Sequence, residues 1–92
     1  MAVTVRIPTP LREFTGDKDA LLLEGATVGA VLQALEAKAP GICAKVLDEN
    51  GKVRRFVNIY AGEEDIRFLD GVNTPLADGA EVSIIPAIAG GR

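Results

Sequence analysis

The sequence predicts one α+β domain, in which a mixed β-sheet of four to five strands carries one main helix packed on one face. Three observations support this prediction. Apolar and polar residues alternate in the stretches 3–7 and 53–61, which is typical of strands that are buried on one side. A single stretch, beginning at Val28, has the apolar spacing of a long helix. A chain of 92 residues is also long enough to bury one modest core.

The first two predicted strands form a hairpin. The strand at 3–7 stops before Pro8, because proline cannot donate a hydrogen bond to a neighbouring strand. Residues 11–17 are expected to form a connecting loop. A second strand is predicted over residues 20–24, where the leucines would also suit a helix, but so short a run between turn residues favours a strand.

The main helix is expected to begin after Thr27, whose hydroxyl can accept a hydrogen bond from a backbone N–H of the first turn. It should end at Pro40 and Gly41, since proline restricts the residue before it and glycine suits a helix exit. Its apolar residues share one face, and they are Val28, Val31, Leu32 and Leu35. The core between helix and sheet is predicted to include Val5, Leu32, Leu35, Val57 and Ile84.

The second half of the chain contains the remaining strands. Residues 42–47 are expected to form a short helical turn, and residues 53–61 the most regular strand. A turn at 62–65 leads to a short strand at 66–68. The last strand contains Val82 and is expected to pair beside the first. The order strand, strand, helix, strand, short strand, strand is that of the β-grasp fold.

Composition excludes several classes of function. The net charge of −3 disfavours nucleic-acid binding, which needs a clustered cationic surface. The chain lacks histidine, the commonest general base and a common metal ligand, so we expect no catalytic site and no metal site. A single cysteine, Cys43, indicates a reducing compartment. Neither a signal peptide nor a stretch of about 20 apolar residues is present, so we expect a cytoplasmic protein without membrane contact.

The C-terminal residues differ from the rest of the chain. After Ile88 the sequence offers no apolar bulk, and two consecutive glycines make this segment thin and free in φ. Such an end suits a terminus that enters a narrow pocket of another protein, although a frayed end is the simpler interpretation of two glycines. We therefore expect a folded domain over residues 1–87 and a flexible tail over 88–92.

A β-grasp order that ends in Gly-Gly resembles the ubiquitin-like sulfur carriers of the ThiS/MoaD family. The resemblance covers nearly the whole chain and is most specific in three stretches. Two of these stretches look closest to the CysO-like branch, which delivers sulfur for cysteine biosynthesis. The three are Arg55-Phe56-Val57-Asn58-Ile59-Tyr60, Asp65-Ile66-Arg67-Phe68, and the run from Thr74 to the ending Pro86-Ala87-Ile88-Ala89-Gly90-Gly91.

The resemblance implies a carrier and not an enzyme. The Gly91 carboxylate would be adenylated by an ATP-dependent activating enzyme, and a sulfur donor would then convert it to a thiocarboxylate. Ala89 and Gly90 would thread into that enzyme. A sulfur-accepting synthase would receive the sulfur, for cysteine or for another product such as thiamin or molybdopterin. ATP would be consumed by the partner, and the carrier would bind no cofactor.

One residue departs from the family pattern. The working terminus of the family is the second glycine, but here Arg92 follows Gly91. The resemblance implies a proform that a protease trims, often a zinc metallopeptidase of the JAMM type. An artificial addition of Arg92 is the alternative.

Two further features allow more than one interpretation. Phe56, Tyr60, Ile85 and Pro86 would form an apolar docking patch for the activating enzyme, or they are scattered apolar surface residues without a role. Cys43 would be a persulfide relay, but a lone cysteine between apolar neighbours is more often a small buried hydrophobe.

Two other functions share these features. The same activated tail could form an isopeptide bond between Gly91 and a lysine of another protein, which would make the chain a protein modifier. The third hypothesis is a purely structural ubiquitin-like interaction domain, in which the Gly-Gly end has no chemical role.

Overall fold

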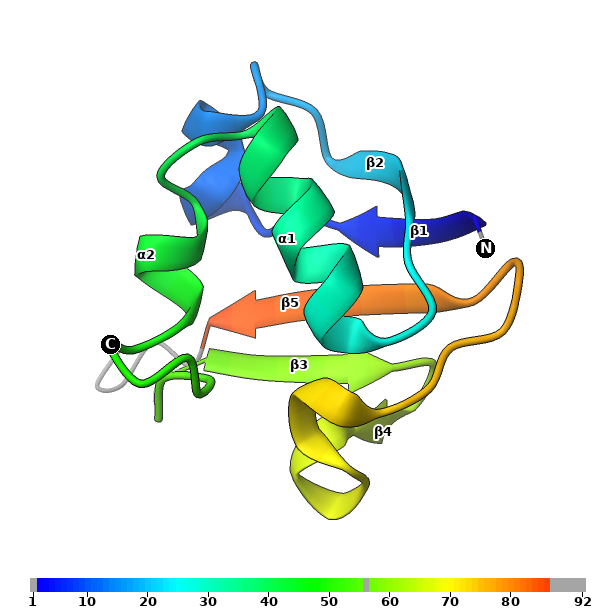
Figure 1. The fold of residues 1–92 in the computed structure, drawn as a ribbon. Helices are drawn as coiled ribbons and strands as arrows, with labels where there is room; N and C mark the ends of the chain where they lie inside the picture. Colours follow the sequence, from blue (N-terminus) through cyan, green and yellow to red (C-terminus); the bar gives the residue numbers. More distant parts are fainter. Residues whose placement is uncertain (1, 56, 87–92) are drawn as a thin grey trace.

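The computed structural model describes residues 2–55 and 57–86. These residues form five strands and two α-helices, and Figure 1 shows them wound into one layer of sheet and one layer of helix. The strands are β1 (Ala2–Arg6), β2 (Ala20–Glu24), β3 (Val57–Ala61), β4 (Glu64–Asp65) and β5 (Glu81–Pro86), and the helices are α1 (Val28–Lys38) and α2 (Cys43–Val46).

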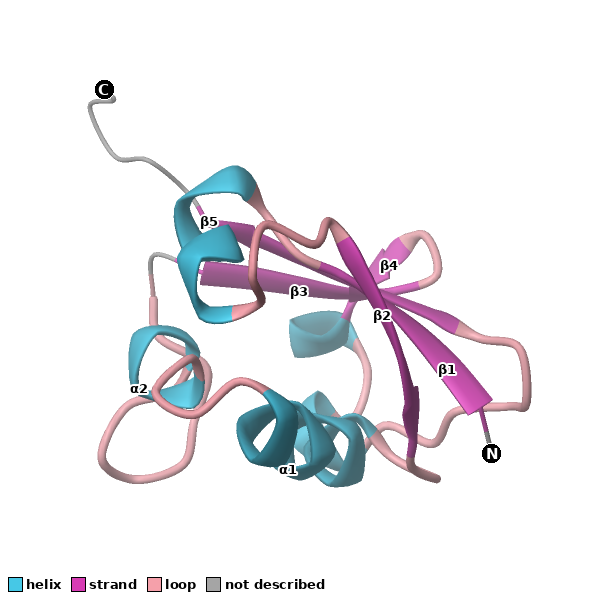
Figure 2. Ribbon diagram, turned by 90° about the horizontal axis from the view of Figure 1, so that it is seen from above, coloured by secondary structure: helices cyan, strands magenta, loops and turns pink. Residues whose placement is uncertain are grey.

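The sheet is mixed, with the strand order β2-β1-β5-β3-β4. Strand β1 pairs with β2 as an antiparallel hairpin and with β5 in parallel, and β3 pairs antiparallel with β5 and β4. A parallel pair needs a crossover connection, and the chain that contains α1 provides it. Figure 2 shows both helices on the same side of the sheet. This arrangement confirms the predicted β-grasp fold.

The core lies between α1 and the sheet. All four apolar residues of the predicted helix face are buried, and so are the five predicted core residues Val5, Leu32, Leu35, Val57 and Ile84. Side chains alternate between the two faces of a strand. In β1, β3 and β5 the buried residues alternate with more exposed ones, so one face of the sheet packs on the core and the other face is open. Burying one such aliphatic side chain contributes about 1.5–3 kcal/mol.

The two ends of α1 are held by side chains. The Thr27 hydroxyl accepts a hydrogen bond from the Ala30 N–H at 3.1 Å, as the sequence predicts for a helix cap. At the other end, the Glu36 carboxylate accepts from the N–H groups of Gly41 and Cys43 at 2.8 and 3.0 Å. These bonds connect α1 to α2 and lower the pKa of Glu36 from its ordinary value, because both N–H groups stabilise the charged form.

Two predictions in the first half of the chain are wrong in detail. Residues 11–17 do not form a plain loop, since Thr9–Phe14 form a 3-10 helix that buries Leu11. Proline near the first helical positions favours this start, because its φ is already helical. The predicted strand at 53–61 begins only at Val57, while Val53 forms an isolated bridge with Leu47.

The predicted short strand at 66–68 is also wrong, since these residues form a 3-10 helix. The edge strand β4 instead lies in the segment that the sequence analysis assigns to a turn. A strand would place Ile66 and Phe68 on one face, but Ile66 is buried and Phe68 is 85% exposed. The Asp65 carboxylate accepts a hydrogen bond from the Arg67 N–H at 2.9 Å and so favours the helical turn.

Candidate functional site

The chain leaves the sheet at Pro86, the last described residue of β5. Pro86 pairs with Val57, so this exit lies at the end of the sheet where β3 begins. The predicted tail residues Ala89, Gly90, Gly91 and Arg92, and the predicted boundary between residues 87 and 88, lie outside the described residues. The candidate site is therefore the part of the sheet that surrounds this exit.

The open face of the sheet brings two predicted docking residues together. Tyr60 pairs with Ser83, and Ile85 pairs with Asn58, so Tyr60 and Ile85 are diagonal neighbours across β3 and β5. Ile85 is 46% exposed and Tyr60 is half-buried. Pro86 is the residue after Ile85 and therefore takes the other face of the strand. Phe56 lies outside the described residues.

Arg67 holds the start of β3, and the sequence analysis did not predict this role. Its Nη2 donates to the Val57 carbonyl at 2.6 Å and to the Arg54 carbonyl at 3.0 Å, and its Nη1 donates to Asn58 Oδ1 at 3.0 Å. The short strand β4 pairs only with Tyr60 and Ala61 of β3. The guanidinium therefore occupies an edge of β3 that β4 leaves uncovered, next to the exit.

The environment of Cys43 does not favour a persulfide relay. Its Sγ donates a hydrogen bond to the Leu32 carbonyl at 3.3 Å, and the thiol is half-buried against the core. Burial, followed by the nearby Glu36 charge, raises the pKa of Cys43 to about 11. The thiolate is the nucleophilic form of cysteine, so this site keeps the sulfur in its unreactive state near neutral pH.

Two further kinds of site are absent from the described residues. Within residues 2–55 and 57–86, no three His, Cys, Asp or Glu side chains gather in a way that could hold a metal ion. In the same ranges no helix is long and apolar enough to cross a bilayer. What the described site offers is an open sheet face, on which Ile85 lies next to the exit at Pro86 and Tyr60 lies diagonally from Ile85.

A β-grasp domain whose last strand delivers the chain end beside an open sheet face defines a ubiquitin-like protein. The ThiS family matches residues 5–91, which is nearly the whole chain and includes both C-terminal glycines. The chain belongs to the ThiS family.

Relatives match this chain from end to end. The sulfur carrier protein CysO of Mycobacterium tuberculosis (strain ATCC 25618 / H37Rv) is 50% identical over 93 residues, covering 99% of this chain and 100% of the relative. The small archaeal modifier protein 3 of Haloferax volcanii is 37% identical over 93 residues, with the same coverage of both chains. This chain thus resembles one relative that is named a carrier and another that is named a modifier.

Solved structures show the same fold. A chain from the crystal structure of the Amycolatopsis orientalis BexX/CysO complex superposes with a TM-score of 0.90 at 41% identity, covering 94% of this chain and 96% of that chain. The crystal structure of Mycobacterium tuberculosis CysO gives a TM-score of 0.89 at 48% identity, covering 92% of this chain and 98% of that chain.

Proposed function

We propose that this ThiS-family carrier transports sulfur as a thiocarboxylate on Gly91. The observation that supports the proposal most strongly is the full-length identity of 50% to a sulfur carrier protein, together with a family match that reaches residue 91. The fold agrees, because a sheet with one open face and a chain end beside it can dock while the terminus enters a partner.

The chemistry requires a partner enzyme. A carboxylate is a poor electrophile, so an ATP-dependent adenylating enzyme first joins the Gly91 carboxylate to AMP and releases pyrophosphate. A sulfur donor then attacks the acyl carbon, AMP leaves, and the terminus becomes a thiocarboxylate. The carrier supplies no general acid or base in these steps, which agrees with a chain that has no histidine.

A residue after Gly91 blocks the first step. The Gly91 carbonyl that is bonded to Arg92 has no free oxyanion to attack ATP. We therefore propose that a peptidase, of the JAMM metallopeptidase type, removes Arg92 before activation. Ala89 and Gly90 then thread into the activating enzyme, where their small size suits a narrow channel.

The open face of the sheet is the proposed docking surface. Ile85 lies on it next to the exit, and Tyr60 lies on it diagonally from Ile85. The proposed surface also includes Pro86, which follows Ile85 in the sequence, and Phe56, which precedes Val57. The BexX/CysO complex shows that a similar protein assembles with a partner. The sulfur acceptor is a biosynthetic synthase, and identity to CysO favours cysteine as its product over thiamin or molybdopterin.

A second function is favoured by one specific match. The archaeal relative named as a modifier indicates that the activated Gly91 could instead acylate a lysine of another protein. The two functions share the adenylation step and differ in the nucleophile that follows. Blots of cell extract against the chain would show slower-migrating conjugates if it acts as a modifier.

Intact-protein mass spectrometry tests the proposed carrier function. We would incubate a chain that ends at Gly91 with the purified activating enzyme, ATP and sulfide. Its mass should rise by the difference between one sulfur and one oxygen atom. The chain that retains Arg92 should not react, and Gly91→Ala in the trimmed chain should react poorly because a Cβ thickens the tail. Conversion of the Arg92 chain at the full rate, with Arg92 retained, would contradict the proposal.

A further inference from the structure

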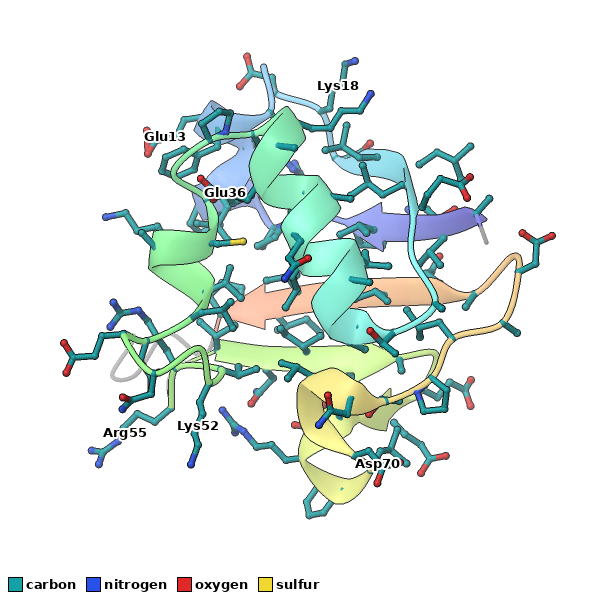
Figure 3. The ribbon with its side chains drawn as sticks, in the orientation of Figure 1. Glu13, Lys18, Glu36, Lys52, Arg55 and Asp70 are labelled. Atoms are coloured by element: carbon teal, nitrogen blue, oxygen red, sulfur yellow. The ribbon has the colours of Figure 1, made fainter. Side chains whose placement is uncertain are left out.

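One corner of this acidic protein carries a cluster of positively charged side chains. Of its ten Lys and Arg residues, four line a single shallow hollow of about 640 Å³, and only one acidic residue, Asp48, lines it with them. Figure 3 shows Lys52 and Arg55 at this corner, far from Lys18 at the opposite side of the molecule. We call this group the cationic corner, and its members are Lys52, Arg54, Arg55 and Arg67.

Neutral acceptors hold two of these side chains. Arg67 donates to three backbone carbonyls and to the Asn58 side-chain amide, and Arg54 Nε donates to the Ala44 carbonyl at 3.1 Å. Such acceptors orient a guanidinium without neutralising its charge. The Asp48 carboxylate accepts hydrogen bonds from the backbone N–H groups of Asn50 and Lys52. Arg54 and Arg67 are thus held in fixed positions in the cationic corner.

This surface lies where the chain leaves the fold. Three of its members, Lys52, Arg54 and Arg55, lie two to five residues before Val57, and Val57 pairs with Pro86 at the exit. The segment from 87 to 91 can reach roughly 15 Å when extended. A partner that admits Gly91 into a channel must therefore bring the rim of that channel close to the cationic corner.

The other end of the sheet has the opposite charge. Ala61, at the end of β3, pairs with Val82, at the start of β5, so the turns next to both residues lie together far from the exit. These turns and strand ends carry Glu63, Glu64, Asp78 and Glu81. One of them, Glu81, pairs with Arg6 at 3.0 Å. These four acidic residues thus lie at the end of the sheet opposite the cationic corner.

We propose that the cationic corner docks on an acidic surface beside the channel of the activating enzyme that admits the tail. This inference rests on the proposed function, because it assigns an orienting contact to the same activation step. An approaching acidic surface attracts the exit end and repels the opposite end, so encounters begin with the tail facing the channel. Nucleic acid is a weaker candidate for the occupant, since the whole chain has a net charge of −3.

Steady-state kinetics of activation test the proposal. The carrier would end at Gly91, and pyrophosphate release by the purified activating enzyme would be measured against carrier concentration. The variant Lys52→Glu with Arg55→Glu should raise the KM for the carrier about tenfold and leave kcat unchanged, because the contact steers binding. Arg54 and Arg67 stay in place, since their side chains also hold the backbone.

A matched control has the same change of charge elsewhere. Lys18→Glu with Lys38→Glu alters two exposed lysines away from the exit and should change the KM less than about twofold. The wild-type KM should rise with added sodium chloride, and this rise should be smaller in the variant of the cationic corner. Circular dichroism checks that both double variants fold. The variant Lys52→Gln with Arg55→Gln removes the two charges without reversing them, so it should raise the KM by a smaller factor.

The outcomes separate the two proposals. Equal KM values for both double variants would overturn the inference alone, and so would a fall in kcat at constant KM. RNA that binds the wild type but not the variant, with KM unchanged, would also overturn it. A wild-type chain that is never activated would instead reject the proposed function and this inference with it.

Discussion

At the scale of single residues, Cys43 and Arg67 show how a local contact decides the role of a side chain. Cys43 donates its S–H to a helix carbonyl, and burial keeps the thiol protonated. The Arg67 guanidinium donates to the Val57 carbonyl at the start of β3, where β4 provides no backbone partner. Burial thus lowers the thiolate fraction of Cys43, whereas Arg67 shapes the surface beside the exit.

The Cys43 thiol should resist modification at moderate pH. At pH 8 a thiol with a pKa of about 11 is almost fully protonated, whereas an ordinary thiol titrates near 8.5. Labelling with a disulfide reagent should therefore be at least about tenfold slower in the folded chain than in the urea-unfolded chain. Equal rates would restore the persulfide relay as a candidate.

The raised pKa of Cys43 also makes the free energy of unfolding depend on pH in the alkaline range. The folded pKa of Cys43 is raised, so between about 8.5 and about 11 the unfolded chain loses this proton while the folded chain keeps it. The free energy of unfolding should then fall as pH rises through that window. Urea denaturation at a series of pH values should show a weaker fall in Cys43→Ala, which lacks the titrating group.

At the scale of elements, α1 supplies the helical half of the core. Its stripe of apolar residues packs against alternate residues of β1, β3 and β5, and its two ends are held by Thr27 and Glu36. The exposed residues of the same strands form the open face. The helix therefore decides which face of the sheet a partner can reach.

Truncating the helix stripe should destabilise the domain strongly. Leu35 has no exposed surface, so Leu35→Ala leaves a cavity and should lower the free energy of unfolding by about 2–5 kcal/mol. Leu22→Ala makes the same chemical change at a side chain that is 70% exposed, and it should cost less than about 0.5 kcal/mol. Urea denaturation measures both values, and similar costs would show that the helix face is misassigned.

At the scale of the whole molecule, the parallel pairing of β1 with β5 places the last strand in the middle of the sheet. Strand β5 is therefore held by β1 over residues 81–83 and by β3 as far as Pro86. The apolar patch of Tyr60 and Ile85 and the cationic corner flank this anchor.

A charge placed on the open face should separate docking from folding. Ile85→Arg should raise the KM of the Gly91-terminated carrier for activation about tenfold or more, because a buried contact in the complex would be replaced by a charge. Leu22→Arg changes another exposed leucine-sized residue on the same face, on β2 and away from the exit, and should leave the KM within about twofold. Equal effects of both variants on the KM would place the docking surface elsewhere.

The sequence by itself determined the main helix, the buried stripe, the pairing of the last strand with the first, and the family. The 3.6-residue spacing of α1 and the alternation in β1 and β3 depend on local geometry, so a linear pattern contains them. It also predicted a carrier and not an enzyme, because the resemblance to the family covers nearly the whole chain.

Tertiary structure alone decided the features at the exit. The segment 66–68 alternates like a strand, but burial of Ile66 and the Asp65 hydrogen bond to the Arg67 N–H make it a 3-10 helix. Only this turn lets the Arg67 guanidinium reach β3, ten residues back in the chain. The cationic corner likewise contains residues that are far apart in the sequence, since Arg67 lies beside Lys52, Arg54 and Arg55 only in the folded chain. The pairing of Val57 with Pro86 then places this group near the exit.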